Sequence, residues 1–220
     1  GEIGLTYQII GNYEKADEYI KKAISLAPNE TSHYADLAYN TVLWTGNLKE
    51  ARRILERMSQ RGPVSFWYQS VEERNRAEAL AYLDSLKRQV FITQNSYTPV
   101  SLMRGLTYQW LDGDTAGTAH FAAAKDLLQS HLEDMPDDFR IFAALGLACG
   151  GLGQKAEALQ YARRAVELCP VERDALAGPD QLLNEVHVRI LVGEHEAAID
   201  GIERLLNMPA GDRLSIPSLK

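Results

Sequence analysis

Apolar residues recur along most of the chain at the three-to-four-residue spacing of helices that are apolar on one face. A glycine followed by a polar residue interrupts this pattern at intervals of about 35–40 residues, with one interval about twice as long. Glycine adopts the left-handed conformation that ends a helix, and a polar residue after it caps the next helix. The sequence therefore predicts pairs of helices joined by tight turns. The turn dipeptides are Gly11-Asn12, Gly46-Asn47, Gly113-Asp114, Gly153-Gln154 and Gly193-Glu194.

Residue types are also restricted at fixed distances from these glycines. A small side chain five residues after a glycine lets the two helices of a pair approach closely. It occurs at Ala16, Ala51, Thr118, Ala158 and Ala198. A proline seventeen residues after the glycine is expected to end the second helix. It occurs at Pro28, Pro63 and Pro170.

The pentapeptide GLTYQ occurs twice, at residues 4–8 and at residues 105–109. The separation equals three periods of about 34 residues, a period typical of helical solenoids. The pattern resembles the tetratricopeptide repeat, a helix–turn–helix unit with Leu-Gly and Tyr in its first helix and Gly, Ala, Ala and Pro downstream. Unit one matches this signature at Ile3-Gly4, Tyr7, Gly11, Tyr13, Ala16, Ala23 and Pro28. Unit five matches it at Leu145-Gly146, Gly153, Ala158, Ala165 and Pro170.

The resemblance extends over residues 1–208 and implies an all-α fold, an α-solenoid of about six helix-turn-helix (TPR-like) hairpins that form a right-handed superhelix. The third unit lacks its turn glycine and is inferred from the apolar spacing of residues 76–86. We expect units one to three in residues 1–89, an irregular link at residues 90–99, units four to six in residues 100–208 and a C-terminal tail at residues 209–220.

Composition excludes several classes of partner. The net charge of −7 and the pI of about 5.3 argue against a nucleic-acid-binding surface, which is usually basic. No run approaches the roughly 18 apolar residues that a membrane span requires. The two cysteines do not suggest a disulfide framework and suit a reducing compartment. We therefore expect a cytoplasmic protein with neither a nucleic-acid nor a membrane partner.

Catalytic motifs are weak. The segment GLACGGLGQK at residues 146–155 lacks the Gly-Lys-Ser/Thr ending of a phosphate-binding loop. The five histidines are scattered and form no zinc-binding helix pair. Helix ends and solvent account for the carboxylate pairs Glu72-Glu73 and Asp137-Asp138, and Cys149 lies at an apolar position typical of a core. The sequence predicts no enzyme activity, no cofactor and no metal site.

The resemblance implies a concave groove that is lined by the first helices of the units and binds a partner segment. Ile9, Trp44 and Trp110 hold matching places just before their turns. These side chains either pack on the next unit or form an aromatic groove that anchors the partner, because tryptophan is enriched in binding hot spots. By alignment, the groove positions are Leu5, Gln8, Ile9, Asp36, Asn40, Leu43, Trp44, Leu106, Gln109, Trp110, Arg140, Leu147 and His187.

The predicted function is therefore a non-catalytic scaffold that binds a protein or peptide partner. The Lys and Asn residues with which related repeats bind the acidic C-terminus of heat-shock chaperones are missing, since Gly1, Leu5 and Leu37 hold those positions. A second hypothesis rests on the later half of the chain, where residues 160–179, a last hairpin and residues 205–211 resemble the repeat regions that end certain bacterial multidomain signalling proteins. The chain would then be the regulatory or sensor segment of a signalling enzyme or transcription regulator, with the catalytic or DNA-binding domain outside these residues.

Overall fold

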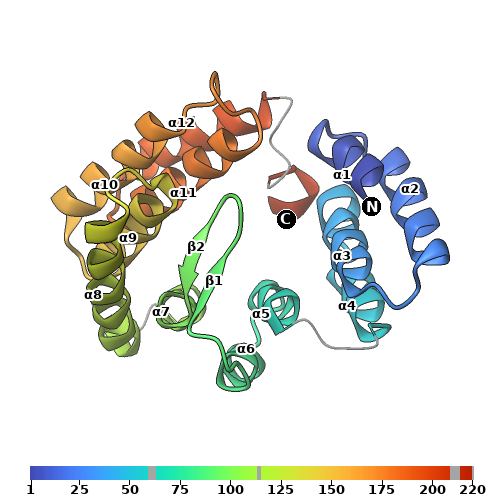
Figure 1. The fold of residues 1–220 in the computed structure, drawn as a ribbon, viewed down its shortest axis with the longest axis horizontal. Helices are drawn as coiled ribbons and strands as arrows, with labels where there is room; N and C mark the ends of the chain where they lie inside the picture. The colour runs from blue at the N-terminus through green and yellow to red at the C-terminus, as the bar shows by residue number, and fades with distance from the viewer. Residues whose placement is uncertain (59–62, 113–114, 209–213, 220) are drawn as a thin grey trace. The chain divides into compact units, whose positions relative to one another are not determined.

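The computed structural model describes residues 1–58, 63–112, 115–208 and 214–219 and confirms the predicted all-α solenoid (Figure 1). Over these residues, twelve α-helices form helix–turn–helix units, and the β-structure is one two-stranded hairpin. The chain divides into two compact units. These compact units, written unit 1 and unit 2, are larger than the repeat units one to six of the sequence. Unit 1 contains residues 1–85 and 206–220, and unit 2 contains residues 86–205.

Unit 1 contains three helical hairpins, in which α1, α3 and α5 are the first helices and α2, α4 and α6 are the second helices. The C-terminal segment of the chain ends in a short 3₁₀-helix that packs on α3 (Figure 1). The elements are α1 (Glu2–Ile9), α2 (Tyr13–Leu26), α3 (Thr31–Thr45), α4 (Leu48–Glu56), α5 (Pro63–Glu72), α6 (Arg76–Asp84) and η2 (Pro217–Leu219).

The tight turns of unit 1 have the predicted geometry. Gly11 and Gly46 have φ values of 74° and 68°, in the left-handed region, and the asparagine after each glycine caps the next helix through its side chain. The third hairpin, which lacks a turn glycine, has Arg74 at φ 57°, followed by the capping residue Asn75. An arginine thus holds the left-handed position, which explains why the glycine pattern misses this turn.

The two GLTYQ segments have the same packing role in their own units. A Cβ atom on Gly4 would lie 2.6 Å from Cγ1 of Ile20, and one on Gly105 would lie 2.8 Å from ring atoms of Phe121. Both contacts join residues that are sixteen positions apart. The tyrosine of each copy stacks on an aromatic ring of the following helix, with ring centroids 5.4 and 5.8 Å apart. The pentapeptide repeats because both first helices need a residue without a side chain at the close helix contact and an aromatic ring three residues later.

Unit 2 contains three further helical hairpins, which follow the β-hairpin β1–β2 in the chain. Here α7, α9 and α11 are the first helices, and α8, α10 and α12 are the second helices. The elements are β1 (Val90–Ile92), β2 (Tyr97–Pro99), α7 (Val100–Asp112), η1 (Thr115–Gly117), α8 (Thr118–Asp134), α9 (Phe139–Gly151), α10 (Lys155–Leu168), α11 (Ala177–Leu191) and α12 (His195–Leu206).

Residues 90–99, where the sequence indicates an irregular link, form the antiparallel hairpin β1–β2. Val90 pairs with Pro99, and Ile92 pairs with Tyr97. β-branched and aromatic residues favour such strands. The Tyr97 side chain is buried in the core of unit 2, and its hydroxyl lies 2.5 Å from Nδ1 of His131 on α8. This long-range anchor fixes the strands on the helices, and in Figure 1 the hairpin lies beside α7.

The core of unit 2 is centred on α9, where residues 143–150 are all buried. Small residues allow close packing, since a Cβ atom on Gly151 would lie 2.4 Å from the ring of Phe121. Cys149 is buried in this core, as its apolar position predicts. The turn glycines Gly153 and Gly193 have φ values of 71° and 79°. The predicted turn Gly113-Asp114 lies outside the described residues.

Candidate partner-binding surface

The two amide side chains among the predicted groove positions of unit 1 are buried and bonded to each other. Nε2 of Gln8 on α1 donates to Oδ1 of Asn40 on α3 at 3.4 Å, and Nδ2 of Asn40 donates to the carbonyl oxygen of Tyr13 at 3.0 Å. A buried amide left without a partner costs roughly 1–3 kcal/mol. Gln8 and Asn40 therefore hold the first two hairpins together, and their polar atoms do not face a ligand.

The apolar positions of unit 1 differ in exposure. The Leu43 side chain is 1% exposed, whereas Leu5 and Ile9 are half-buried. Trp44 lies in the last turn of α3 and is 42% exposed, more than any other residue of the predicted groove set. Among the predicted groove positions of unit 1, Trp44 is therefore the one large aromatic side chain that is exposed.

Asp36 is the charged groove position of unit 1. Burial raises the pKa of its carboxyl to about 6, although the neighbouring His33 acts in the opposite direction. Nδ1 of His33 is itself buried without a hydrogen-bond partner. At neutral pH, α3 thus carries a poorly solvated negative charge about 12 Å along the helix axis from Trp44, since the two residues are eight positions apart.

The groove positions of unit 2 are more tightly packed. Leu106 and Leu147 are buried, and Gln109 is half-buried. Trp110 packs against the core, with its ring centroid 5.8 Å from that of His187 on α11. Burial lowers the pKa of His187 to about 4, so its imidazole is neutral at physiological pH. Trp44 and Trp110 hold equivalent sequence positions, but only Trp110 is covered by a neighbouring ring.

Arg140, the charged groove position of unit 2, binds the chain's own β-hairpin. Its Nη2 lies 2.6 Å from Oδ2 of Asp138, and its Nη1 donates to the carbonyl oxygen of Thr93 at 2.8 Å. The same turn contacts α11, where Nδ2 of Asn95 donates to Oδ2 of Asp180 at 3.0 Å. Residues 93–95 therefore occupy part of the surface that the sequence assigns to a partner.

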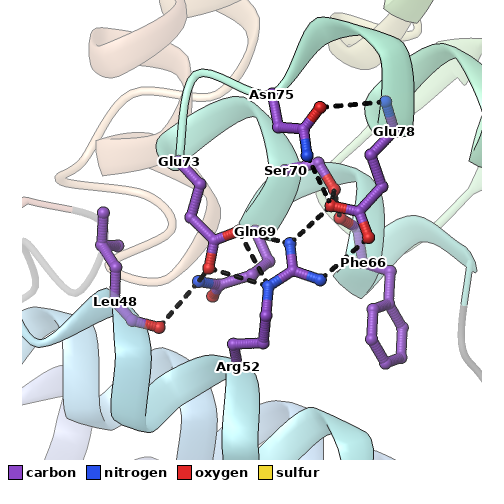
Figure 2. Close-up of polar contacts among 8 residues, drawn as sticks. All are labelled: Leu48, Arg52, Phe66, Gln69, Ser70, Glu73, Asn75 and Glu78. Carbon is purple, nitrogen blue, oxygen red and sulfur yellow. Dashed lines mark hydrogen bonds and ion pairs between the residues drawn. The ribbon is translucent and has the colours of Figure 1, made fainter.

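A charged cluster that the sequence pattern does not predict joins α4 to the α5–α6 hairpin. Figure 2 shows the guanidinium of Arg52 between the carboxylates of Glu73 and Glu78. Nε of Arg52 donates to Oε1 of Glu73 at 2.8 Å, and Nη2 donates to Oε2 of Glu78 at 2.8 Å. Nε2 of Gln69 donates to Glu73 at 2.7 Å and to the carbonyl oxygen of Leu48 at 2.9 Å. Arg52 thus bridges two helical hairpins.

The electrostatics of this cluster favour its ionised form. Burial acts to raise the pKa of Glu73, but the hydrogen bonds from Arg52 and Gln69 outweigh it and hold that pKa below its usual value. Glu72 and Glu73 lie at a helix end, as the sequence predicts, since α5 ends at Glu72. The carboxylate of Glu73 is not accounted for by solvent alone, because it accepts hydrogen bonds from Arg52 of another hairpin.

Groups with the chemistry of a reactive centre are sparse over the described ranges. No cluster of His, Cys, Asp or Glu there could hold a metal ion. No helix of those ranges is both long and apolar enough to cross a membrane. Cys149 and Cys169 are free and buried, and burial raises the pKa of both thiols. A raised thiol pKa opposes thiolate chemistry at either residue.

The fold and this surface define a class of protein, an α-solenoid of helical hairpins with an exposed aromatic side chain at one of the predicted groove positions. The tetratricopeptide-repeat family model matches residues 1–30 and 139–172, the two units with the most complete signatures. A solved structure described as PilW, a widely conserved type IV pilus biogenesis factor, is similar to this chain with a TM-score of 0.50 and 18% sequence identity. That similarity covers 99% of this chain and 94% of the other, and it concerns the fold. No curated protein matches the chain.

Proposed function

We propose that the protein is a non-catalytic protein-interaction scaffold that binds a segment of a partner protein along the first helices of its hairpins. The repeat-family match and the helical-hairpin fold support this class. Trp44 is the observation that carries the proposal, because this large aromatic side chain is 42% exposed on a rigid helix. Tryptophan is enriched in binding hot spots.

The available side chains of unit 1 define the chemistry of the partner segment. Trp44 offers an apolar contact, and the half-buried Leu5 and Ile9 on α1 are the other apolar groove positions of unit 1 that are not fully buried. Asp36 offers a negative charge in a poorly solvated place, and a basic side chain would relieve its desolvation. We therefore assign to the partner a segment with one bulky apolar residue and one Lys or Arg about 12 Å away.

Unit 2 has a smaller part in the proposal. Leu106 and Leu147 are buried, and Arg140 binds the β-hairpin, so these side chains serve the fold. Gln109 remains half-buried, and Trp110 and His187 contact each other. We place the first contact with a partner on unit 1 for this reason.

Photo-crosslinking tests the proposal. A photoreactive amino acid replaces Trp44 in one variant and Leu26 in a control, since Leu26 is an apolar residue of the second helix α2 that is 78% exposed. We expect partner adducts at position 44 and none at position 26, and Trp44→Ala should reduce partner capture while the melting temperature stays within a few degrees of wild type. Equal adduct yields at the two positions would argue against the proposal.

The expected compartment is the cytoplasm, which suits the two unbridged thiols. The alternative, a regulatory segment of a bacterial signalling enzyme or transcription regulator, makes a different prediction. Its partner would be a domain encoded in the same reading frame, so crosslinks from position 44 of the full-length protein would be intramolecular.

A further inference from the structure

We propose that residues 214–219, called here the tail segment, are an intramolecular ligand of α3. The tail segment docks on the last turn of α3, the turn that carries Trp44, and a partner segment that binds this turn competes with it. The part of the proposal that concerns competition rests on the proposed function, whereas the docking itself does not.

The tail segment binds a helix end that needs a donor. The last carbonyl groups of a helix have no intrahelical hydrogen-bond partner. The hydroxyl of Ser215 donates to one of them, the carbonyl oxygen of Leu43, at 2.6 Å. Ser215 is 6% exposed, so the bond is shielded from water. Its partners are 172 positions apart in the sequence.

The turn after α3 has the shape that this contact requires. A Cβ atom on Gly46 would lie 2.7 Å from the carbonyl oxygen of Pro217, too close for any side chain. Gly11 has the same left-handed conformation, but a Cβ atom there would meet nothing within 4 Å. Gly153 and Gly193 are equally open. Among the four left-handed turn glycines of the described chain, Gly46 alone is covered by another segment.

The tail segment also has hydrogen bonds of its own. The backbone N–H of Ser215 donates to Oγ of Ser218 at 3.0 Å, and the backbone N–H of Ser218 donates to Oγ of Ser215 at 3.2 Å. This reciprocal pattern has the form of a helix capping box, with serine at both places. Preorganisation lowers the ordering cost of binding, and the tail segment belongs to the same chain as α3, so its docking is an intramolecular step.

These features define the kind of segment that competes. The tail segment has the sequence LSIPSL and carries no charged side chain. A competing segment would need a serine hydroxyl for the Leu43 carbonyl and a backbone that passes over the bare Cα of Gly46. Trp44, which is 42% exposed, follows Leu43 in the same turn of α3.

A peptide-binding experiment on the full chain tests the proposal. The probe is a fluorescent synthetic peptide of residues 212–220, and its affinity is measured by anisotropy. Ser215→Glu removes the donor and forces a charge into the contact, so it should release the chain's own tail segment while leaving α3 unchanged. We expect this variant to bind the probe at least about tenfold more tightly than wild type, because its own tail no longer competes.

A matched pair of second substitutions locates the site. In the Ser215→Glu chain, Gly46→Ala should abolish probe binding, because the new methyl group occupies the place of the Pro217 carbonyl. Gly11→Ala imposes the same left-handed strain without touching the tail segment, and it should leave the affinity within about twofold. Circular dichroism melting establishes whether each variant is folded. If the Ser215→Glu chain does not fold, Ser215→Ala replaces it as the milder substitution.

Three results would overturn the proposal. The first is equal probe affinity in wild type and the Ser215→Glu chain, and the second is an equal loss in the Gly46→Ala and Gly11→Ala chains. The third is a wild-type dimer in light scattering that Ser215→Glu dissociates, because the tail segment would then bind a second copy. Crosslinking at position 44 is independent of all three, so a failure here is distinguishable from a failure of the proposed function.

Discussion

Replacement of Arg52 by methionine is expected to weaken the attachment of the α5–α6 hairpin to α4. Methionine keeps most of the aliphatic stem and removes the guanidinium that lies between Glu73 and Glu78. Removal of one partner from a fully buried ion pair costs about 3–5 kcal/mol. The side chains here are 20–30% exposed, so water solvates the two remaining carboxylates in part. We therefore expect a loss of about 2–3 kcal/mol.

The neighbouring arginine provides the control. The Arg53 side chain is 75% exposed and pairs with Glu50 at 3.3 Å on the same helix. An exposed pair of this kind contributes about 0.5 kcal/mol or less. Hydrogen exchange of the α6 backbone amides reports the local opening of the hairpin. Arg52→Met should lower the opening free energy of the α5–α6 hairpin by about 2–3 kcal/mol, whereas Arg53→Met should leave it almost unchanged.

The effect of Arg52→Met should also depend on pH. The folded-state pKa of Glu73 lies below its usual value of 4.5, so its ionised form stabilises the fold above pH 4.5. That contribution is lost as the pH falls through the lowered pKa. The difference between wild type and Arg52→Met should therefore be complete at pH 7 and shrink below pH 4.5. Equal losses for the two arginine variants, or a difference that does not shrink as the pH falls below 4.5, would refute the bridging role of Arg52.

Three further predictions concern other parts of the chain. Gly153→Val should destabilise unit 2 by about 1–3 kcal/mol in thermal unfolding, because φ is 71° there, whereas Gly153→Asn should cost less. Trp110→Ala should lower stability by about 2–4 kcal/mol, since its ring packs on the core, and a stability equal to that of Trp44→Ala would contradict this assignment. Asp36→Asn should stabilise unit 1 by about 1–3 kcal/mol at pH 8 and by little at pH 4, because a carboxyl whose folded pKa is raised to about 6 loses stability as the pH rises from about 4 to 6. Chemical denaturation at the two pH values checks the last prediction.

The helical hairpins could be predicted because their determinants are local. A left-handed turn requires a particular residue type, and Gly11, Gly46, Gly153 and Gly193 all have the positive φ that the pattern predicts. Close helix contacts likewise select small residues at a fixed spacing. The turn at Arg74 could not be predicted in this way, because an arginine holds the left-handed position and its residue type does not indicate that conformation.

The side-chain clusters could not be predicted because their partners are distant in the sequence. Arg52 meets carboxylates 21 and 26 residues downstream, and Asn95 meets Asp180 85 residues downstream. Trp44 and Trp110 have equivalent places in the repeat, but the ring of His187 covers only Trp110. Exposure, which decides whether a tryptophan can anchor a partner, depends on neighbours that the repeat pattern does not specify.

The β-hairpin and the tail segment, which lie outside the repeat pattern, reduce the number of polar groups that a partner could bind. A repeat describes the helices that line a groove, but it says nothing about insertions and ends. In unit 2, the guanidinium of Arg140 donates to the carbonyl oxygen of Thr93 in the β-hairpin turn. In unit 1, the hydroxyl of Ser215 in the tail segment donates to the carbonyl oxygen of Leu43. Each segment satisfies a donor or acceptor that a partner could otherwise use. The proposed recognition in unit 1 therefore rests on the exposed ring of Trp44 and on the partly buried carboxylate of Asp36. Partner choice in this chain is therefore expected to depend on its non-repeat segments as much as on the helices themselves.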